Sequence, residues 1–133
     1  MKIENIKFKA KRLDNGEWCE GYFYEENGNT YIIENRQKES MLNRNVTYEV
    51  DPSTVCQFTG MKDCKDNEVW EGDILQDVDY DYIKYVIIFG EGTFLARKEG
   101  HYTGIPLHEC VGSLGNDVIT YAKVVGNKFD KEK

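Results

Sequence analysis

Residues 55–74, VCQFTGMKDCKDNEVWEGDI, organise the expected fold because they hold two β-prone runs separated by a polar segment. The first run, at 55–58, follows Asp51-Pro52, a pair that favours a turn. Gly60 is expected to end this strand, since glycine weakens strand interiors. The first half of the stretch therefore predicts a turn followed by a short strand.

The second half of the stretch predicts a loop and a tight turn. Residues 62–67 are rich in Asp and Asn and are expected to form a solvated loop. The apolar pair Val69-Trp70 precedes Gly72-Asp73, where glycine supplies a positive φ and the carboxylate accepts nearby backbone N–H groups. Asp73 is therefore assigned a structural rather than a catalytic role, directly before the next strand.

The same stretch resembles the signature of the YopX family of phage and prophage proteins. The resemblance rests on VCQFTGMKD at 55–63 and EVWEGDI at 68–74. Weaker matches follow in the expected order, namely IKFKA at 6–10, YVIIFGEGTF at 85–94 and KVVGN at 123–127. Together these segments span nearly the whole chain. The resemblance implies a phage or prophage lineage, and it implies no known activity.

Short alternating runs separated by turn residues predict an all-β fold. Residues 1–13 alternate apolar and basic side chains, as in a half-buried strand. Asn15-Gly16 and Asn27-Gly28 are hairpin signals, so residues 3–34 are expected to form a three-stranded meander. Further strands are expected at 46–50, 84–89, 93–97 and 119–125. The pattern predicts about eight to ten short antiparallel strands in a small barrel-like or sandwich domain.

Two segments lack a strand pattern. Residues 34–45 are polar and predict either a plain loop or a helical turn around Met41-Leu42. Residues 105–114 predict one short helix, because Pro106 is tolerated in a first helical turn. The fold is therefore expected to contain one or two short helical turns.

Length and composition predict one cytoplasmic domain. A chain of 133 residues is long enough for a single core, so residues 1–133 are assigned to one YopX-like domain. No apolar run approaches the ~20 residues that cross a bilayer, and the opening MKIENIKFKAKR lacks the apolar segment of a signal peptide. In the reducing cytoplasm the four cysteines are expected to be free thiols, buried as small apolar side chains.

Charge is distributed unevenly along the chain. The net charge of −7 disfavours nucleic-acid or membrane binding over the whole surface. Residues 1–12 nevertheless hold five Lys/Arg against one Glu, a balance of +4, and residues 61–81 hold two Lys against eight Asp/Glu, a balance of −6. These regions are solvated faces, contact each other within the fold, or meet head to tail between copies. The interaction surface predicted from them comprises Lys7, Lys9, Lys11, Arg12, Asp77, Asp79, Tyr80, Asp81 and Tyr82.

No motif predicts catalysis or a cofactor. Asp77, Asp79 and Asp81 have the 1-3-5 spacing of a calcium loop, but Tyr82 and Ile88 stand where such a loop needs Gly and Glu. A solvated acidic loop is therefore favoured over a looser cation site. The cysteines and histidines lack the close pairs of a zinc site, and none belongs to a nucleophile motif. We expect no metal, no cofactor and no catalytic residue.

The first functional hypothesis is a non-enzymatic phage or prophage accessory protein. It would act as a protein-interaction module, as a homo-oligomer or with a host or phage protein. The alternative is a β-barrel that binds single-stranded nucleic acid through the basic first strand, with Trp18 and Tyr22 for stacking. The negative net charge ranks this alternative second. An enzyme of unrecognised type ranks third.

Overall fold

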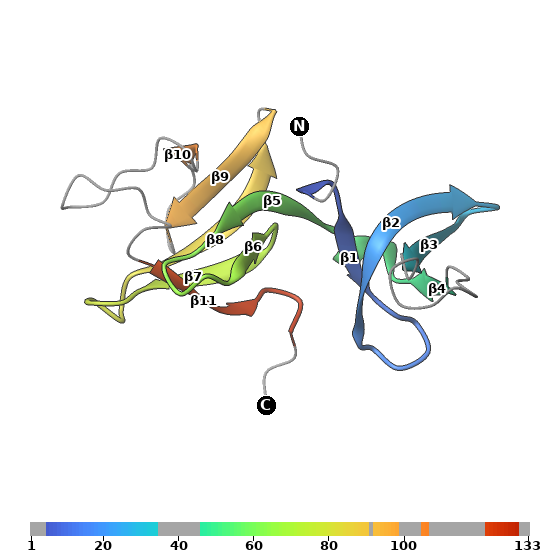
Figure 1. Cartoon of the computed structure of the whole chain (residues 1–133), viewed down its shortest axis with the longest axis horizontal. Helices are drawn as coiled ribbons and strands as arrows, with labels where there is room; N and C mark the ends of the chain where they lie inside the picture. Colours follow the sequence, from blue (N-terminus) through green and yellow to red (C-terminus); the bar gives the residue numbers. More distant parts are fainter. Residues whose placement is uncertain (1–4, 35–45, 91, 99–104, 107–121, 131–133) are drawn as a thin grey trace. The chain divides into compact units, whose positions relative to one another are not determined.

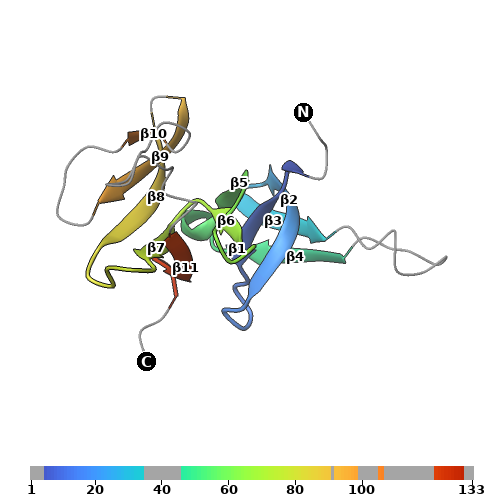
Figure 2. The ribbon, with the colours of Figure 1, turned by 60° about the vertical axis from the view of Figure 1, so that its left-hand side comes forward.

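The computed structural model describes residues 5–34, 46–90, 92–98, 105–106 and 122–130. They form eleven strands in antiparallel sheets and one 3₁₀ turn, which confirms the predicted all-β fold. The chain divides into two compact units, Met1–Phe58 and Thr59–Lys133, and each is described by itself (Figure 1, Figure 2). The assignment of the whole chain to one domain stays a prediction. Within the described ranges, no helix is long and apolar enough to cross a membrane.

The first unit contains four strands and the beginning of a fifth. They are β1 (Phe8–Lys11), β2 (Trp18–Glu26), β3 (Asn29–Glu34), β4 (Val46–Val50) and β5 (Cys56–Lys62), with the 3₁₀ turn Pro52–Thr54 before β5. Their order in the sheet is β4-β3-β2-β1-β5. β2 and β3 form a hairpin that turns through Asn27 and Gly28, both at positive φ, as the Asn-Gly pair predicts.

The sheet of the first unit closes on itself into a small, partly open barrel. β1 pairs with β2 along one edge and with the start of β5 along the other. Past the end of β1, the chain bonds to the end of β4 through Leu13 N–H to Glu49 O and Asp51 N–H to Lys11 O. The Asp51 carboxylate accepts the Ser53 N–H and so caps the 3₁₀ turn that leads into β5. This unit matches the barrel-like alternative of the prediction.

The core of the first unit lies on one face of its curved sheet. Ala10, Cys19, Ile32 and Val50 are buried there, and Phe8 packs against them. Side chains alternate across a strand, so Phe8 and Ala10 lie on one face of β1 and its lysines lie on the other. Burial of Ile32 and Val50 stabilises the unit by about 2 kcal/mol each.

The second unit combines a five-stranded sheet with a short hairpin. Its own strands are β6 (Glu68–Trp70), β7 (Asp73–Asp77), β8 (Lys84–Gly90), β9 (Thr93–Lys98), β10 (Ile105–Pro106) and β11 (Ala122–Asn127). Five of them form the sheet β10-β9-β8-β7-β11, while β6 neighbours β5. Val69 of β6 and Met61 of β5 pack with Leu75 and Ile87 of the sheet. The hairpin that carries the signature segment therefore covers the core of this unit.

Three local predictions are corrected by the structure. Gly60 does not end β5, because the strand continues through it to Lys62 with Gly60 at a φ of 82°. The segment 62–67 is not wholly solvated, because Asp63 is buried. The helix expected at 105–114 is wrong at its start, where Ile105–Pro106 pair with β9 as a strand. The rest of that segment, and residues 35–45, lie outside the described residues.

Candidate functional site

The first predicted surface is the basic strand, comprising Lys7, Lys9, Lys11 and Arg12. The Lys7 ammonium lies 3.2 Å from Glu20 Oε1 and 4.8 Å from the centre of the Phe58 ring. The ammonium nitrogens of Lys9 and Lys11 lie 4.6 and 5.3 Å, respectively, from the centre of the Trp18 ring. Such cation–π contacts hold an ammonium group in place without cancelling its charge. The strand therefore presents positioned cations beside an aromatic ring.

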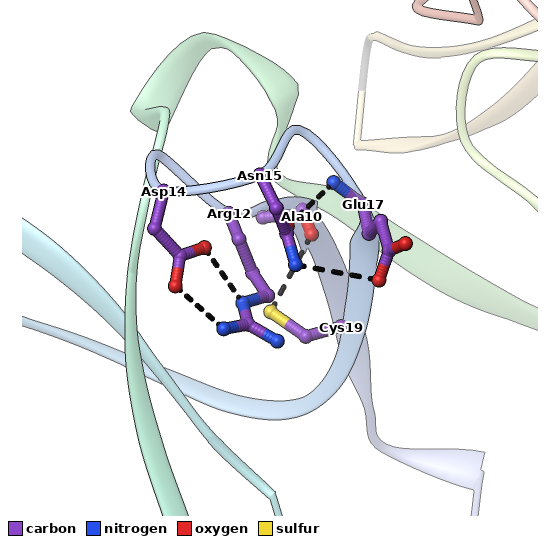
Figure 3. Close-up of polar contacts among 6 residues, drawn as sticks. All are labelled: Ala10, Arg12, Asp14, Asn15, Glu17 and Cys19. Atoms are coloured by element: carbon purple, nitrogen blue, oxygen red, sulfur yellow. Dashed lines mark hydrogen bonds and ion pairs between the residues drawn. The ribbon is translucent and has the colours of Figure 1, made fainter.

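Arg12 belongs to a more local cluster at the start of the loop between β1 and β2. Its guanidinium donates two hydrogen bonds to the Asp14 carboxylate, at 2.9 and 2.6 Å (Figure 3). It also lies 4.0 Å from the centre of the Tyr48 ring. The hydrogen bond raises the pKa of Arg12 and lowers the pKa of Asp14. Asp14 therefore balances the guanidinium charge of Arg12.

The second predicted surface lies between β7 and β8, and Asp77 organises its backbone. Asp77 Oδ1 accepts the N–H groups of Asp79 and Tyr80, at 2.8 and 3.0 Å. The Asp77 N–H donates to Ile83 O, and the Ile83 N–H donates to Tyr80 O. Gln76 Nε2 donates to Asp81 O at 3.0 Å. These bonds give residues 78–82, called here the 78–82 loop, a defined conformation.

The 78–82 loop turns apolar and aromatic side chains toward solvent. Tyr82 is 76% exposed, Tyr80 is 50% exposed and Val78 is 43% exposed. The two tyrosine rings meet edge to face with their centres 6.1 Å apart. Asp79 and Asp81 alternate with them along the chain and are exposed as well. Exposed aromatic rings on an ordered loop resemble the anchors of protein interfaces, which are enriched in Tyr.

The calcium-like spacing of the loop does not assemble a ligand set. Asp77 directs one carboxylate oxygen to backbone N–H groups of its own loop. Among the residues that the structure describes, no group of three or more His, Cys, Asp or Glu side chains could hold a metal ion. Asp77 therefore acts on the backbone of its own loop.

A buried polar network in the second unit was not predicted as a cluster. Asp63 is 6% exposed, and its carboxylate accepts four hydrogen bonds. Lys65 and Asn67 donate their N–H groups to Oδ1, while the Asn67 side chain and the Val124 N–H donate to Oδ2. The bond to Val124, at 2.7 Å, ties the loop before β6 to β11. Burial alone would raise the pKa of Asp63, but the hydrogen bonds from Val124, Asn67 and Lys65 outweigh it, and the pKa is lowered.

Asp73 forms the second half of this network and has the structural role predicted for it. Its Oδ2 accepts the Trp70 N–H at 2.7 Å, and its Oδ1 accepts Asn127 Nδ2 at 3.0 Å. Asn127 also donates to Glu71 O, so the last strand is bonded to the turn before β7. Gly72 at this turn has a φ of 85° and leaves room for the Asn127 side chain. Apart from the turn at Gly72-Asp73, the sequence signal for this cluster is that Asp63, Asp73 and Asn127 lie in segments resembling the YopX signature.

The cysteines follow the prediction only in part. Cys19, Cys56 and Cys64 are free thiols. Cys19 and Cys56 are buried as expected, but Cys64 is exposed. Cys19 Sγ donates to Ala10 O (Figure 3). Burial and the charge of Glu34 raise the pKa of the Cys19 thiol to about 11.

We expect iodoacetamide to label Cys64 well over tenfold faster than Cys19 in the folded protein, because the thiolate is the reactive form and Cys19 is both buried and rarely ionised. Peptide mass spectrometry over a labelling time course measures both rates. In urea the two rates should converge, which provides the internal control. Equal rates in the folded protein would contradict the burial of Cys19.

Comparison with known proteins agrees with the positions of the residues that hold the buried network. Asp63, Asp73 and Asn127, which hold the buried network, all lie in segments that resemble the YopX signature. No curated protein matches the chain. The family model described as YopX protein matches residues 7–132. The chain therefore belongs to the YopX family.

Proposed function

We propose that this protein is a non-enzymatic phage or prophage accessory protein of the cytoplasm that acts as a self-associating interaction module. The observation that carries the proposal is the 78–82 loop. Hydrogen bonds that the Asp77 carboxylate accepts order its backbone, while Tyr80 and Tyr82 stay exposed. Little conformational entropy is lost when an ordered loop binds, so such a loop is suited to docking.

The partner proposed for the loop is the basic strand of a second copy. The loop carries two exposed carboxylates, Asp79 and Asp81, beside its tyrosines. The basic strand carries Lys9 and Lys11, whose ammonium groups are positioned beside the Trp18 ring. Opposite charges on two surfaces of one chain favour head-to-tail contact between copies. A head-to-tail contact is heterologous and generates rings or open chains.

A charge-reversal experiment tests the proposal in solution. One variant, Asp79→Lys with Asp81→Lys, removes the acidic surface, and another, Lys9→Glu with Lys11→Glu, removes the basic surface. Each variant alone is expected to be monomeric, since every contact between identical copies needs both surfaces. When the two are mixed, each contact between unlike variants again joins surfaces of opposite charge, so the mixture is expected to recover masses above the monomer. Light scattering coupled to size-exclusion chromatography measures the masses.

The matched control reverses two acids elsewhere on the same chain. Glu25→Lys with Glu26→Lys changes the net charge by the same amount at the exposed end of β2. This variant should self-associate like the wild type. The wild-type assembly should weaken as salt rises past about 0.1 M, where the Debye length is about 10 Å. A wild-type protein that is monomeric at every concentration and at low salt would refute self-association.

Single-stranded nucleic-acid binding on the basic strand remains the alternative outcome of the same test. Stacking of a base on Trp18 would have to displace Lys9 or Lys11 from its ring. Tyr22, the other predicted stacking residue, lies on β2 two residues from Glu20, a carboxylate that repels phosphate. An oligonucleotide complex that forms at low salt and is lost with Lys9→Glu and Lys11→Glu would favour the alternative over self-association.

A further inference from the structure

The chain contains two Asn-Gly pairs in turns, and the structure treats them differently. In an Asn-Gly pair the backbone nitrogen of glycine can attack the side-chain amide carbon of asparagine. Ammonia leaves, a five-membered succinimide forms, and water then opens the ring to aspartate or to isoaspartate. Glycine favours this step because it has no Cβ atom to crowd the attacking nitrogen. The pairs are Asn15-Gly16 in the loop after β1 and Asn27-Gly28 in the β2–β3 hairpin.

Hydrogen bonds hold both reacting groups of the first pair. Asn15 Oδ1 accepts the Glu17 N–H at 2.9 Å, and Asn15 Nδ2 donates to Glu17 Oε2 at 3.3 Å (Figure 3). The attacking group is engaged too, because the Gly16 N–H donates to Arg12 O at 2.9 Å. Reaction at Asn15 therefore requires three hydrogen bonds to break together.

The second pair is held only by the fold of its two-residue turn. Asn27 has a φ of 53° and Gly28 a φ of 83°, and both are exposed. Among the described residues no hydrogen bond is formed by the Asn27 side chain or by the Gly28 N–H. A Cβ atom built on Gly28, like one built on Gly16, would meet nothing within 4 Å, so open space is common to both pairs and the hydrogen bonds are what distinguish them. The Asn27 backbone therefore reaches the reactive geometry once this exposed turn opens.

We propose that Asn27 is a site of spontaneous modification, which loses its amide as ammonia and becomes isoaspartate or aspartate, whereas the fold protects Asn15. The only co-reactant is water, which opens the succinimide. This inference is independent of the proposed interaction surfaces.

The modification would alter the hairpin in two ways. Isoaspartate routes the main chain through the former side chain, which adds one carbon to a turn that has room for two residues. Aspartate or isoaspartate also places a negative charge next to Glu25 and Glu26. The register Glu26↔Asn29 and, two residues further on, the stacked pair Tyr24 and Tyr31 depend on this turn. The product is therefore expected to loosen the open end of the hairpin.

Peptide mapping of the full chain tests the proposal. The folded protein and a urea-unfolded sample are aged in the same mildly alkaline buffer, and amide loss at each asparagine is followed by mass spectrometry. In urea both pairs should react at similar rates. In the folded protein Asn15 is expected to react at least about tenfold more slowly than Asn27, which corresponds to ~1.4 kcal/mol of additional protection.

Two further outcomes decide the inference. Asn27→Gln keeps an amide but lengthens the side chain, and it should abolish the fast reaction while leaving the slow reaction at Asn15 unchanged. Equal rates at the two pairs in the folded protein would overturn the proposal, as would faster reaction at Asn15. Because the comparison is made within one molecule, differences in buffer or temperature do not affect it.

Discussion

Replacing Gly21 with alanine is expected to destabilise the first unit by roughly 3 kcal/mol or more. A Cβ atom at this position would overlap with Ile33 O and lie 2.7 Å from Ile33 C. Both are backbone atoms of β3, so no side-chain rotation relieves the clash. The methyl group fits only if β2 and β3 separate where Tyr22 pairs with Ile33.

The position of Gly21 in the strand explains the close approach. β2 pairs with β1 from Trp18 through Gly21, and with β3 from Tyr22 onward. Gly21 therefore stands where the strand leaves one partner and takes the next. Glycine inside a strand is typical of such bends, because another backbone can approach where no Cβ stands. A methyl group at this point opposes the curvature that closes the barrel.

Urea unfolding monitored by tryptophan fluorescence, with Trp18 in β2 as a reporter, measures this effect. Gly90→Ala is the matched control, because it adds the same methyl group to a strand glycine whose Cβ would make an ordinary contact of 3.6 Å with Leu95 Cδ1. We expect the control to change the free energy of unfolding by less than about 1 kcal/mol. If Gly21→Ala unfolds at the same urea concentration as the control, the close approach of β3 does not constrain this position.

The strands were predictable from the sequence where their signals are local. β4 matches its predicted bounds, and the turn at Asn27-Gly28 forms as the pair indicates. Prediction failed where a distant segment decides the outcome. β5 runs through Gly60 because β6 offers it a partner, and the need for glycine at position 21 arises from the backbone of β3. The alternation of apolar and polar residues around Gly60 and Gly21 predicts neither of these contacts.

The candidate surfaces were predictable as charges but not as contacts. The alternation along β1 places Lys9 and Lys11 on one side, as expected. That Trp18 lies under both ammonium groups depends on the pairing of Lys11 with Trp18, which the loop between the strands sets. Asp77 was predicted as part of a charged surface, but the structure buries it, and its carboxylate orders the loop backbone instead. Asp63 ties the loop before β6 to β11, whereas the sequence predicts a solvated loop at this position.

Replacing Asp63 with asparagine is expected to destabilise the second unit by about 2–3 kcal/mol at neutral pH. The substitution keeps the size of the side chain but turns one acceptor oxygen into an NH₂ donor. That NH₂ group would face N–H donors, either those of Val124 and the Asn67 side chain or those of Lys65 and Asn67. At least one partly buried backbone N–H group therefore loses its acceptor, either at Val124 of β11 or at Lys65 and Asn67 of the loop before β6.

The pH dependence of unfolding separates this role from a simple packing effect. The pKa of Asp63 is lowered in the folded protein, so its carboxylate contributes stability that is fully present above the unfolded-state pKa, about 4. That contribution is lost as the pH falls through the lowered folded-state pKa. The gap in unfolding free energy between wild type and Asp63→Asn should therefore be widest near neutrality and shrink in acid.

The matched control makes the same chemical change three residues away. Asp66→Asn removes an exposed carboxylate whose ion pair with Lys62, at 3.6 Å, is open to solvent, and asparagine tolerates the φ of 66° found there. Its unfolding free energy should follow that of the wild type at every pH. A gap between Asp63→Asn and the wild type that stays constant from neutral to acidic pH would show that the carboxylate charge contributes nothing. The hydrogen bond to Val124 would then stabilise the fold only as a neutral contact.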